Sequence, residues 1–277
     1  MVKKLFKHEI AYYLRSMLPV YGILLAIAGF SRFIQFFETD NTVYNTVNII
    51  AILTYVVAII AVLAMTMVFT ITRYYRNLFT SEGYLSFTLP VTSTQHIFTK
   101  LSTAVLFHVL SLVVILLSVC IITAGDVLVE VVKAVAYIVD LVPERLAFTF
   151  KETTAAQWQV NIWLFVIEFI LLFIAAIIHQ MLLYYGCITV GQTFSKNRIL
   201  AAVGVYFGYY MITQAIGTVF IIVSQFLPWE TFADIFYAAP IGCIHTLAIS
   251  YILLNLLIAT GLFAISHVII RRKLNLE

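Results

Sequence analysis

Six long apolar runs constrain this chain more than any other feature of its sequence. They cover Leu18–Phe37, Val47–Ile71, Leu101–Thr123, Val160–Gly186, Ile199–Phe226 and Leu247–Ile270. Each run has about the 20 residues that a helix needs to cross the hydrocarbon layer of a bilayer. The composition agrees, because 63% of the residues are hydrophobic, 10% are charged and the mean hydropathy is +1.04. The sequence therefore predicts an all-α integral membrane protein with six transmembrane helices.

The placement of the basic residues predicts how these helices are oriented. With both termini in the cytoplasm, 12 of the 16 Lys and Arg residues lie on the cytoplasmic side, as the positive-inside rule requires. These are Lys3, Lys4, Lys7, Arg15, Arg73, Arg76, Lys100, Lys196, Arg198, Arg271, Arg272 and Lys273. Lys133, Arg145 and Lys151 lie outside. Arg32, within the first run, can extend to the interface or pair with a carboxylate such as Glu38. We expect a multi-pass plasma-membrane protein with both termini in the cytoplasm.

Residues 1–17 predict an interfacial elbow helix before the first span. Apolar residues from Val2 to Met17 recur at helical spacing, and the cations of this segment lie mostly on the other side. Such a helix lies in the plane of the lipid headgroups. The alternative is a signal peptide cleaved after residues 26–28, but the long amphipathic leading segment and its Glu9 argue against it.

Residues 124–159 predict an excursion on the outer side, which begins with a lateral amphipathic helix. Apolar residues from Leu128 to Val142 share one helical face, and four charged residues interrupt the segment. A seventh span is the alternative. Each of these charges would cost about 2.5–3.5 kcal/mol near the centre of a bilayer. A seventh span would also turn Lys196 and the 271–273 cluster outward.

Residues 227–246, between the fifth and sixth runs, are largely apolar and are interrupted by Pro228, Pro240 and Gly242. Two interpretations remain open for this outer segment. One is a pair of re-entrant half-helices, which require burial by protein or water. The other is an interfacial loop with an aromatic belt that includes Phe236 and Tyr237.

The longest polar interval on the predicted cytoplasmic side is Arg73–Lys100. Residues 80–81 can cap a short helix, which Pro90 ends because proline supplies no backbone N–H. Residues 92–95 have the pattern of a capping box, which begins the next helix. A short helix held crosswise between two spans suits a docking element better than a flexible connector.

This segment also carries a resemblance to a known family. An Arg-bearing helix end, then Glu-Gly, Leu-Pro-Val and a Lys opening the next span resemble the coupling-helix loop of type-2, exporter-like bacterial ABC transporter permeases. The resemblance rests on Arg73, Arg76, Glu82, Gly83, Tyr84, Leu89, Pro90 and Lys100. It implies that the segment docks on a separate cytoplasmic ATPase, with Leu85 adding apolar contact. The six-span layout, the elbow helix and re-entrant helices before the sixth span are further features of that family.

Glu168 is the only acidic residue well inside a predicted span. Charged groups in a bilayer are costly and usually face protein or water. Glu168 either lines a cavity, with Tyr210 and Gln214 as further substrate candidates, or fastens two helices through Arg32 or Gln214. Both interpretations remain open.

The fifth run contains a GxxxG match at Gly204 and Gly208, which marks close helix packing within the chain or, less commonly, a subunit interface. Three histidines on different spans lack metal-ligand spacing, so we interpret them as hydrogen-bonding groups between helices. They are His108, His179 and His267. We interpret Cys120, Cys187 and Cys243 as small buried side chains, with a Cys120–Cys243 bridge as the alternative.

The expected function is that of an ABC exporter permease that moves an amphipathic or hydrophobic cargo outward, such as a peptide, toxin, antibiotic or lipid-like molecule. The sequence contains no P-loop, HExxH or GxSxG motif. We therefore expect no cofactor on this chain, with ATP and Mg²⁺ used by the ATPase partner. The other expected partners are a second permease subunit, identical or related, and the lipid bilayer, but not nucleic acid. The alternatives are a non-transporting immunity or sensor protein and an intramembrane enzyme.

Overall fold

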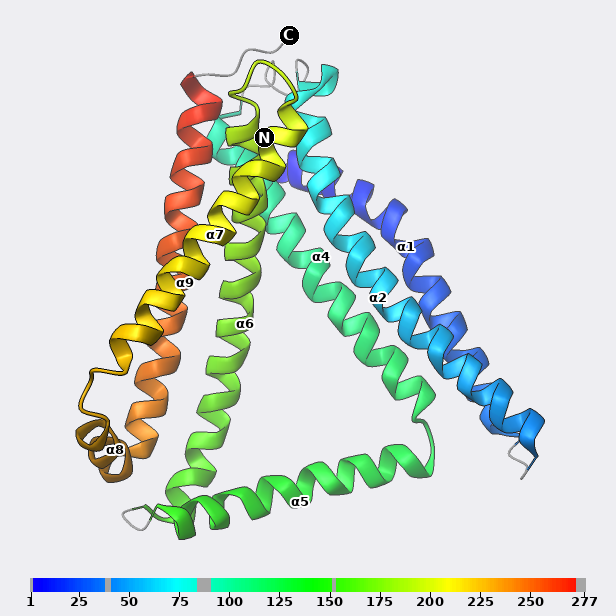
Figure 1. The fold of residues 1–277 in the computed structure, drawn as a ribbon. Coiled ribbons are helices and arrows are strands. Elements are labelled where there is room, and N and C mark those ends of the chain that lie inside the picture. Colours follow the sequence, from blue (N-terminus) through cyan, green and yellow to red (C-terminus); the bar gives the residue numbers. More distant parts are fainter. Residues whose placement is uncertain (1, 38–40, 84–90, 151–152, 273–277) are drawn as a thin grey trace. The chain divides into compact units, whose positions relative to one another are not determined.

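The computed structural model describes residues 2–37, 41–83, 91–150 and 153–272, and the described chain is helical with no strand. The helices are α1 (Val2–Gln35), α2 (Thr42–Phe79), α4 (Ser93–Ile122), α5 (Asp126–Thr149), α6 (Ala155–Gly191), α7 (Arg198–Ser224), α8 (Trp229–Ala238) and α9 (Pro240–Arg272) (Figure 1). The label α3 is not used. The chain forms two compact units, residues 1–133 and 134–275, and their boundary falls within α5.

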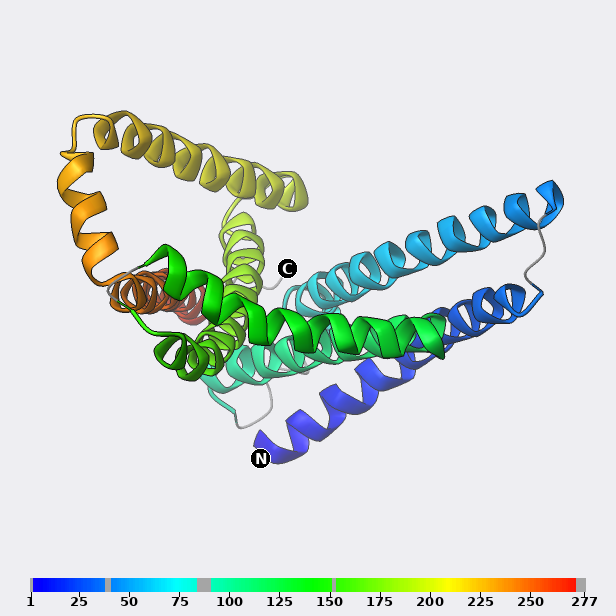
Figure 2. The same ribbon diagram turned by 90° about the horizontal axis from the view of Figure 1, so that it is seen from below.

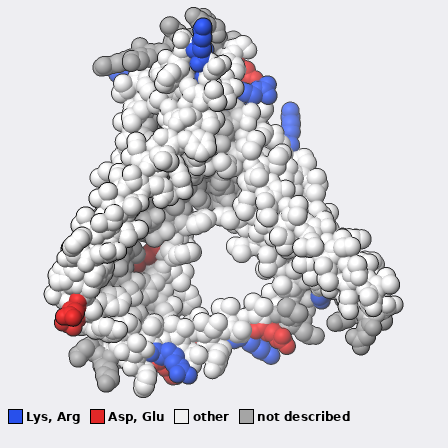
Figure 3. Space-filling view, viewed as in Figure 1, with Lys and Arg blue, Asp and Glu red and all other residues white. Residues whose placement is uncertain are grey.

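Six of the described helices are long and apolar enough to cross a membrane: α1, α2, α4, α6, α7 and α9. The expectation of six apolar helices is therefore confirmed, and the structure is compatible with a multi-pass membrane protein. Each helix extends beyond its predicted apolar run at one end or both; α2, for instance, begins at Thr42 and ends at Phe79. In Figure 3 the visible surface along these helices is mostly uncharged, and most charged residues on this face lie at the top of the view or along α5.

In the first unit, α1 packs against α2 and α4, and α2 packs against α4. Contacts from Glu9 to Arg73 and from Ser31 to Ala51 show that α1 and α2 run in opposite directions. The ring of Tyr13 stacks on Phe107, and α4 runs in the same direction as α1. Three consecutive apolar helices therefore alternate in direction, as spans joined by short connections must.

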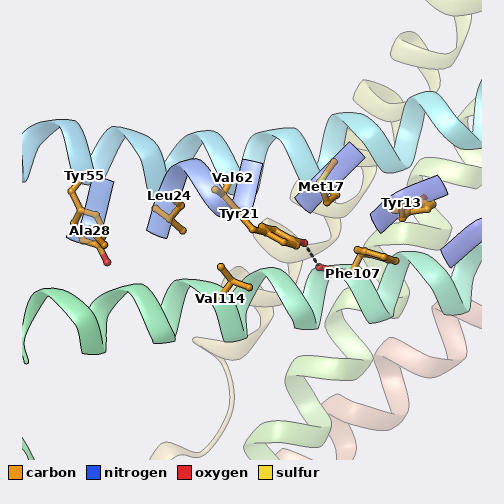
Figure 4. Packing of buried hydrophobic residues seen from close by; sticks show 9 residues of the cluster. All are labelled: Tyr13, Met17, Tyr21, Leu24, Ala28, Tyr55, Val62, Phe107 and Val114. Atoms are coloured by element: carbon orange, nitrogen blue, oxygen red, sulfur yellow. Dashed lines mark hydrogen bonds between the residues drawn. The ribbon is translucent and has the colours of Figure 1, made fainter. Parts of the chain in front are cut away.

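The core of this unit is a stripe on α1 inserted between α2 and α4 (Figure 4). Its buried members follow one another at three- or four-residue spacing, which keeps them on one helical face. They are Tyr13, Met17, Tyr21, Leu24 and Ala28. The hydroxyl of Tyr21 lies 2.7 Å from Ser111 Oγ, which lies 2.9 Å from Thr66 Oγ1. These hydroxyl contacts join all three helices inside the apolar core.

A separate elbow helix is not confirmed, because α1 runs without interruption from Val2 to Gln35 and contains Pro19. The same stripe that packs the predicted span continues through Met17 and Tyr13 into the predicted elbow. These side chains pack against the neighbouring helices, and this packing favours one long helix over two. Lys3, Lys4, Lys7 and Arg15 are exposed, as expected for the polar side.

In the second unit, α6 packs against α7 and α9, and α8 packs against α9. Residues of α6 and α9 pair in ascending order, Glu168 with His245 and His179 with Asn255, so these helices run in the same direction. The pair Tyr184–Tyr206 and the pair His179–Tyr209 show that α7 runs opposite to α6. The second unit therefore also alternates in direction along the chain.

The predicted amphipathic helix after the third span is present as α5, and it is not one of the six apolar helices. Its predicted apolar face is largely uncovered: Val135 and Ile138 are 54% and 53% exposed. The segment 227–246 contains α8, after which α9 begins at Pro240, seven residues before the predicted start of the sixth span (Figure 2). Both interpretations of this segment, re-entrant half-helices and an interfacial loop, stay predictions.

Candidate functional site

An ion cluster lies where the beginning of α1, the end of α2 and the beginning of α4 meet. Lys100 Nζ lies 3.1 Å from Glu9 Oε1, and Arg73 Nε lies 3.2 Å from Glu9 Oε2. Arg73 Nη2 also donates to Glu9 Oε1, at 3.3 Å. The side chains of Glu9 and Lys100 are 3% and 4% exposed. One buried carboxylate thus joins three helices.

The sequence folds in this way because Glu9 occupies the buried stripe of α1, four residues before Tyr13. A carboxylate in that position must be paired, since an unpaired buried charge is costly. Arg73 also pairs with Glu82, where Nη1 and Oε2 are 3.5 Å apart. The guanidinium of Arg73 lies 3.9 Å from the centre of the Tyr12 ring, in a cation–π contact. Two acids and two cations therefore balance in the cluster.

The cluster holds both ends of the Arg73–Lys100 segment. Its central residues Tyr84, Leu85, Leu89 and Pro90 lie outside the described residues, so the predicted short helix stays a prediction. Arg76 is exposed, and the amide of Gly83 donates to the carbonyl of Thr80 at 2.7 Å.

The predicted capping box at the beginning of α4 is confirmed. The amide of Gln95 donates to Thr92 Oγ1, and the amide of Thr92 donates to Gln95 Oε1. The box fixes the place where the segment ends and α4 begins.

A second polar site lies between α6 and α9. Glu168 Oε1 is 2.7 Å from His245 Nδ1, and Asn161 Oδ1 is 2.9 Å from His245 Nε2. The ring of Phe165 stacks on the imidazole, with ring centres 4.3 Å apart. The partner of Glu168 is thus His245 rather than Gln214. Arg32 donates instead to Gln35 in its own unit.

A third polar site connects α6 with both α7 and α9 through His179. Its Nδ1 lies 2.9 Å from Asn255 Oδ1, and its Nε2 lies 3.0 Å from the hydroxyl of Tyr209. The expectation that His179 hydrogen-bonds between helices is confirmed. His108 instead contacts the carbonyl of Ala104 within its own helix.

The remaining candidates lie on α7. Tyr210 and Gln214 are exposed, and none of the described contacts joins either one to Glu168. A methyl group added at Gly204 or Gly208 would meet nothing within 4 Å. These glycines therefore do not mediate close packing within the described chain, contrary to the commoner interpretation of the GxxxG pattern.

The three cysteines are free thiols. Cys187 is buried as expected, Cys243 is partly buried, and Cys120 is exposed, so the interpretation of Cys120 as a buried side chain is wrong.

Sequence reasoning missed Glu9 and His245 as site residues. The signal for Glu9 was an acid in register with the apolar stripe at positions 13, 17 and 21. His245 lies two residues before Leu247, where the apolar run of the sixth span begins, so the sequence predicts a loop position for it. The signal there was the seven-residue spacing of Asn161 and Glu168, which puts both polar side chains on one helical face.

Comparisons of the chain with models of protein families, with curated proteins and with solved structures gave no match. The fold itself defines the class: an all-helical protein with six helices that are long and apolar enough to span a membrane.

Proposed function

We propose that this chain is the membrane subunit of an exporter-like ABC transporter, powered by a separate cytoplasmic ATPase. Two such subunits, identical or related, would enclose a pathway for an amphipathic or hydrophobic cargo. The ATPase pair would bind the Arg73–Lys100 segments, and its ATP-driven closure would move the attached helices.

One observation carries the proposal: both flanks of the Arg73–Lys100 segment bind the same buried carboxylate, Glu9. A force on this segment would therefore reach α1, α2 and α4 together. A flexible connector anchored only through the chain would dissipate the same force. The exposed Arg76 and the partly exposed Glu82 leave charged groups beside the segment for a partner to bind.

The enzyme alternative is less well supported by the polar site on α6 and α9. Both ring nitrogens of His245 are occupied, by Glu168 and by Asn161. A general base needs a nitrogen within hydrogen-bond reach of the proton that it removes. The sensor alternative differs in a testable way, because it requires no ATPase.

The test uses the tagged chain purified from its native membranes. We expect a Walker-motif ATPase and Mg²⁺-dependent ATP hydrolysis to copurify with the unaltered protein. Glu82→Arg should lower both by at least tenfold, because losing a desolvated charged partner costs about 2–5 kcal/mol of association. The contact of Glu82 with Arg73 lies at the partly exposed edge of the cluster, and Arg73 keeps its two contacts with Glu9, so the variant should remain folded.

The matched control is Glu144→Arg, which reverses an exposed acid on α5, on the opposite predicted side of the membrane. It should change neither ATPase copurification nor hydrolysis. Equal copurification from the Glu82→Arg and unaltered proteins would remove the segment as a docking site. Absence of any ATPase from the unaltered protein would instead favour the sensor alternative.

A further inference from the structure

The orientation of one amide fixes a proton on the His245 ring. Asn161 Nδ2 donates to the carbonyl of Gln157 at 2.7 Å, so the oxygen of this amide faces His245 Nε2 at 2.9 Å. An amide oxygen can only accept a hydrogen bond. Nε2 of His245 therefore carries a hydrogen in this arrangement.

The other ring nitrogen meets a second acceptor. Nδ1 of His245 lies 2.7 Å from Glu168 Oε1. A neutral imidazole that carries its hydrogen on Nε2 has only a lone pair at Nδ1, and an ionised carboxylate also offers only lone pairs. Two acceptors at this distance repel each other. A proton must therefore lie between them, on either the nitrogen or the oxygen, and the pair is then neutral as a whole.

The surroundings of the pair are apolar and largely closed to solvent. The side chains of His245 and Glu168 are 19% and 16% exposed, and Phe165 covers the imidazole. Glu168 Oε2 is buried without a hydrogen-bond partner among the described residues. A deprotonated pair would carry a negative charge in this apolar setting, where an isolated charge is costly.

Neither of the two helices that form the pair carries a lysine or arginine near it. Glu168 is the one Asp, Glu, Lys or Arg residue of α6, and α9 has none of these before Arg271. The acids of α8, Glu230 and Asp234, are exposed. Three other titratable side chains lie near the pair along α6 and α9, and none of the described contacts joins them to it. Cys243 contacts the carbonyl of Ile235, and Tyr251 is exposed. His179 contacts Asn255 and Tyr209.

We propose that Glu168 and His245 together form a proton-binding site within the membrane-spanning part of the second unit, and that the bound proton holds α6 against α9. Any movement that separates these two helices breaks the contact and frees the carboxylate and the imidazole to exchange the proton. The ligand is thus H⁺, taken up when the helices close. This site does not depend on the ATPase proposed above.

His179 shows that the inference is specific to one site. Asn255 Nδ2 donates to the carbonyl of Tyr251, so its oxygen faces His179 Nδ1 and that nitrogen carries the hydrogen. The remaining nitrogen, Nε2, faces the hydroxyl of Tyr209, which can donate to it. A neutral imidazole satisfies both contacts, and no extra proton is needed.

The direct test is spectroscopic and uses the full chain at neutral pH. Infrared spectra should show a protonated carboxyl that is absent from Glu168→Gln, or ¹⁵N-histidine NMR should show one imidazolium that is absent from His245→Gln. His179→Gln, the matched control, should retain whichever signal is present. Spectra of the unaltered protein with neither a protonated carboxyl nor an imidazolium would overturn the proposal, whether or not the variants fold.

A second measurement tests whether the contact between Glu168 and His245 stabilises the packing of α6 against α9. In Glu168→Gln the amide nitrogen can donate to His245 Nδ1 without an extra proton, so this variant should keep the thermal stability of the unaltered protein. Glu168→Leu removes the contact and should lower the thermal stability. Equal stabilities of the Leu variant and the unaltered protein would show that the contact does not hold the helices together.

Discussion

A few charged side chains determine which helix ends meet in this otherwise apolar chain. Glu9 and Lys100 are almost completely buried, yet each lies on a helix whose neighbours offer the opposite charge. A buried ion pair contributes little net stability over an apolar pair of the same shape, but removing one partner is costly. Glu9 therefore specifies which helix ends meet more than it stabilises the fold.

The first prediction concerns this residue. Glu9→Gln leaves Lys100 buried without its carboxylate and should lower the free energy of unfolding by about 3–5 kcal/mol. The measurement is thermal or denaturant unfolding of the protein in detergent. Glu144→Gln, on the exposed side of α5, should have no effect. The double variant Glu9→Gln with Lys100→Met should regain much of the loss, and a double variant as unstable as the single one would contradict an ion-pair explanation.

Among the helices, the contact of α6 with α7 depends on close backbone approach at one end. A methyl group added at Gly191 would lie 2.7 Å from both Cβ and the backbone nitrogen of Ala202. Backbone atoms cannot move aside as the tip of a flexible side chain can. The same methyl group at Gly204, farther along α7, would enter open space. Glycine is thus required at one of these positions and not at the other.

This difference gives a matched pair of variants. Gly191→Ala should separate the end of α6 from the beginning of α7 and destabilise the protein by about 1–3 kcal/mol, a typical cost of overpacking. Gly204→Ala should be neutral or slightly stabilising, because alanine favours the helix by about 1 kcal/mol over glycine. Unfolding of both variants in detergent measures the difference. Equal stabilities would mean that α7 is not packed on α6 as described.

The number of long helices was predictable from sequence because apolar length is a strong signal. The capping box at Thr92 was predictable for a similar reason, since it depends on residues close together in the chain. The pairs Glu9–Lys100 and Glu168–His245 were not, because they depend on which helices pack together and in what register. The start of α9 was also misplaced, since the polar His245 interrupts the apolar pattern that continues on either side of it.

At the scale of the whole molecule, the alternating helix directions within each unit agree with a chain that crosses a membrane six times. Helices α1, α2 and α4 alternate in the first unit, and α6, α7 and α9 alternate in the second. The orientation of the chain rests on the basic residues alone, and α5 decides whether the crossings number six or seven. Two exposed lysines, Lys133 on α5 and Lys196 between α6 and α7, report on both questions.

The last prediction uses these two lysines. In a background lacking the three native cysteines, Lys133→Cys should react with an impermeant thiol reagent on intact cells, because the sequence predicts that α5 lies on the outer surface. Lys196→Cys should react only after the membrane is permeabilised, because 12 of the 16 basic residues then lie inside. Reaction at 196 but not at 133 on intact cells would reverse the topology. Protection of position 133 both before and after permeabilisation would show that α5 lies within the bilayer as a seventh span, since a cysteine in the hydrocarbon layer has no water through which the reagent can reach it.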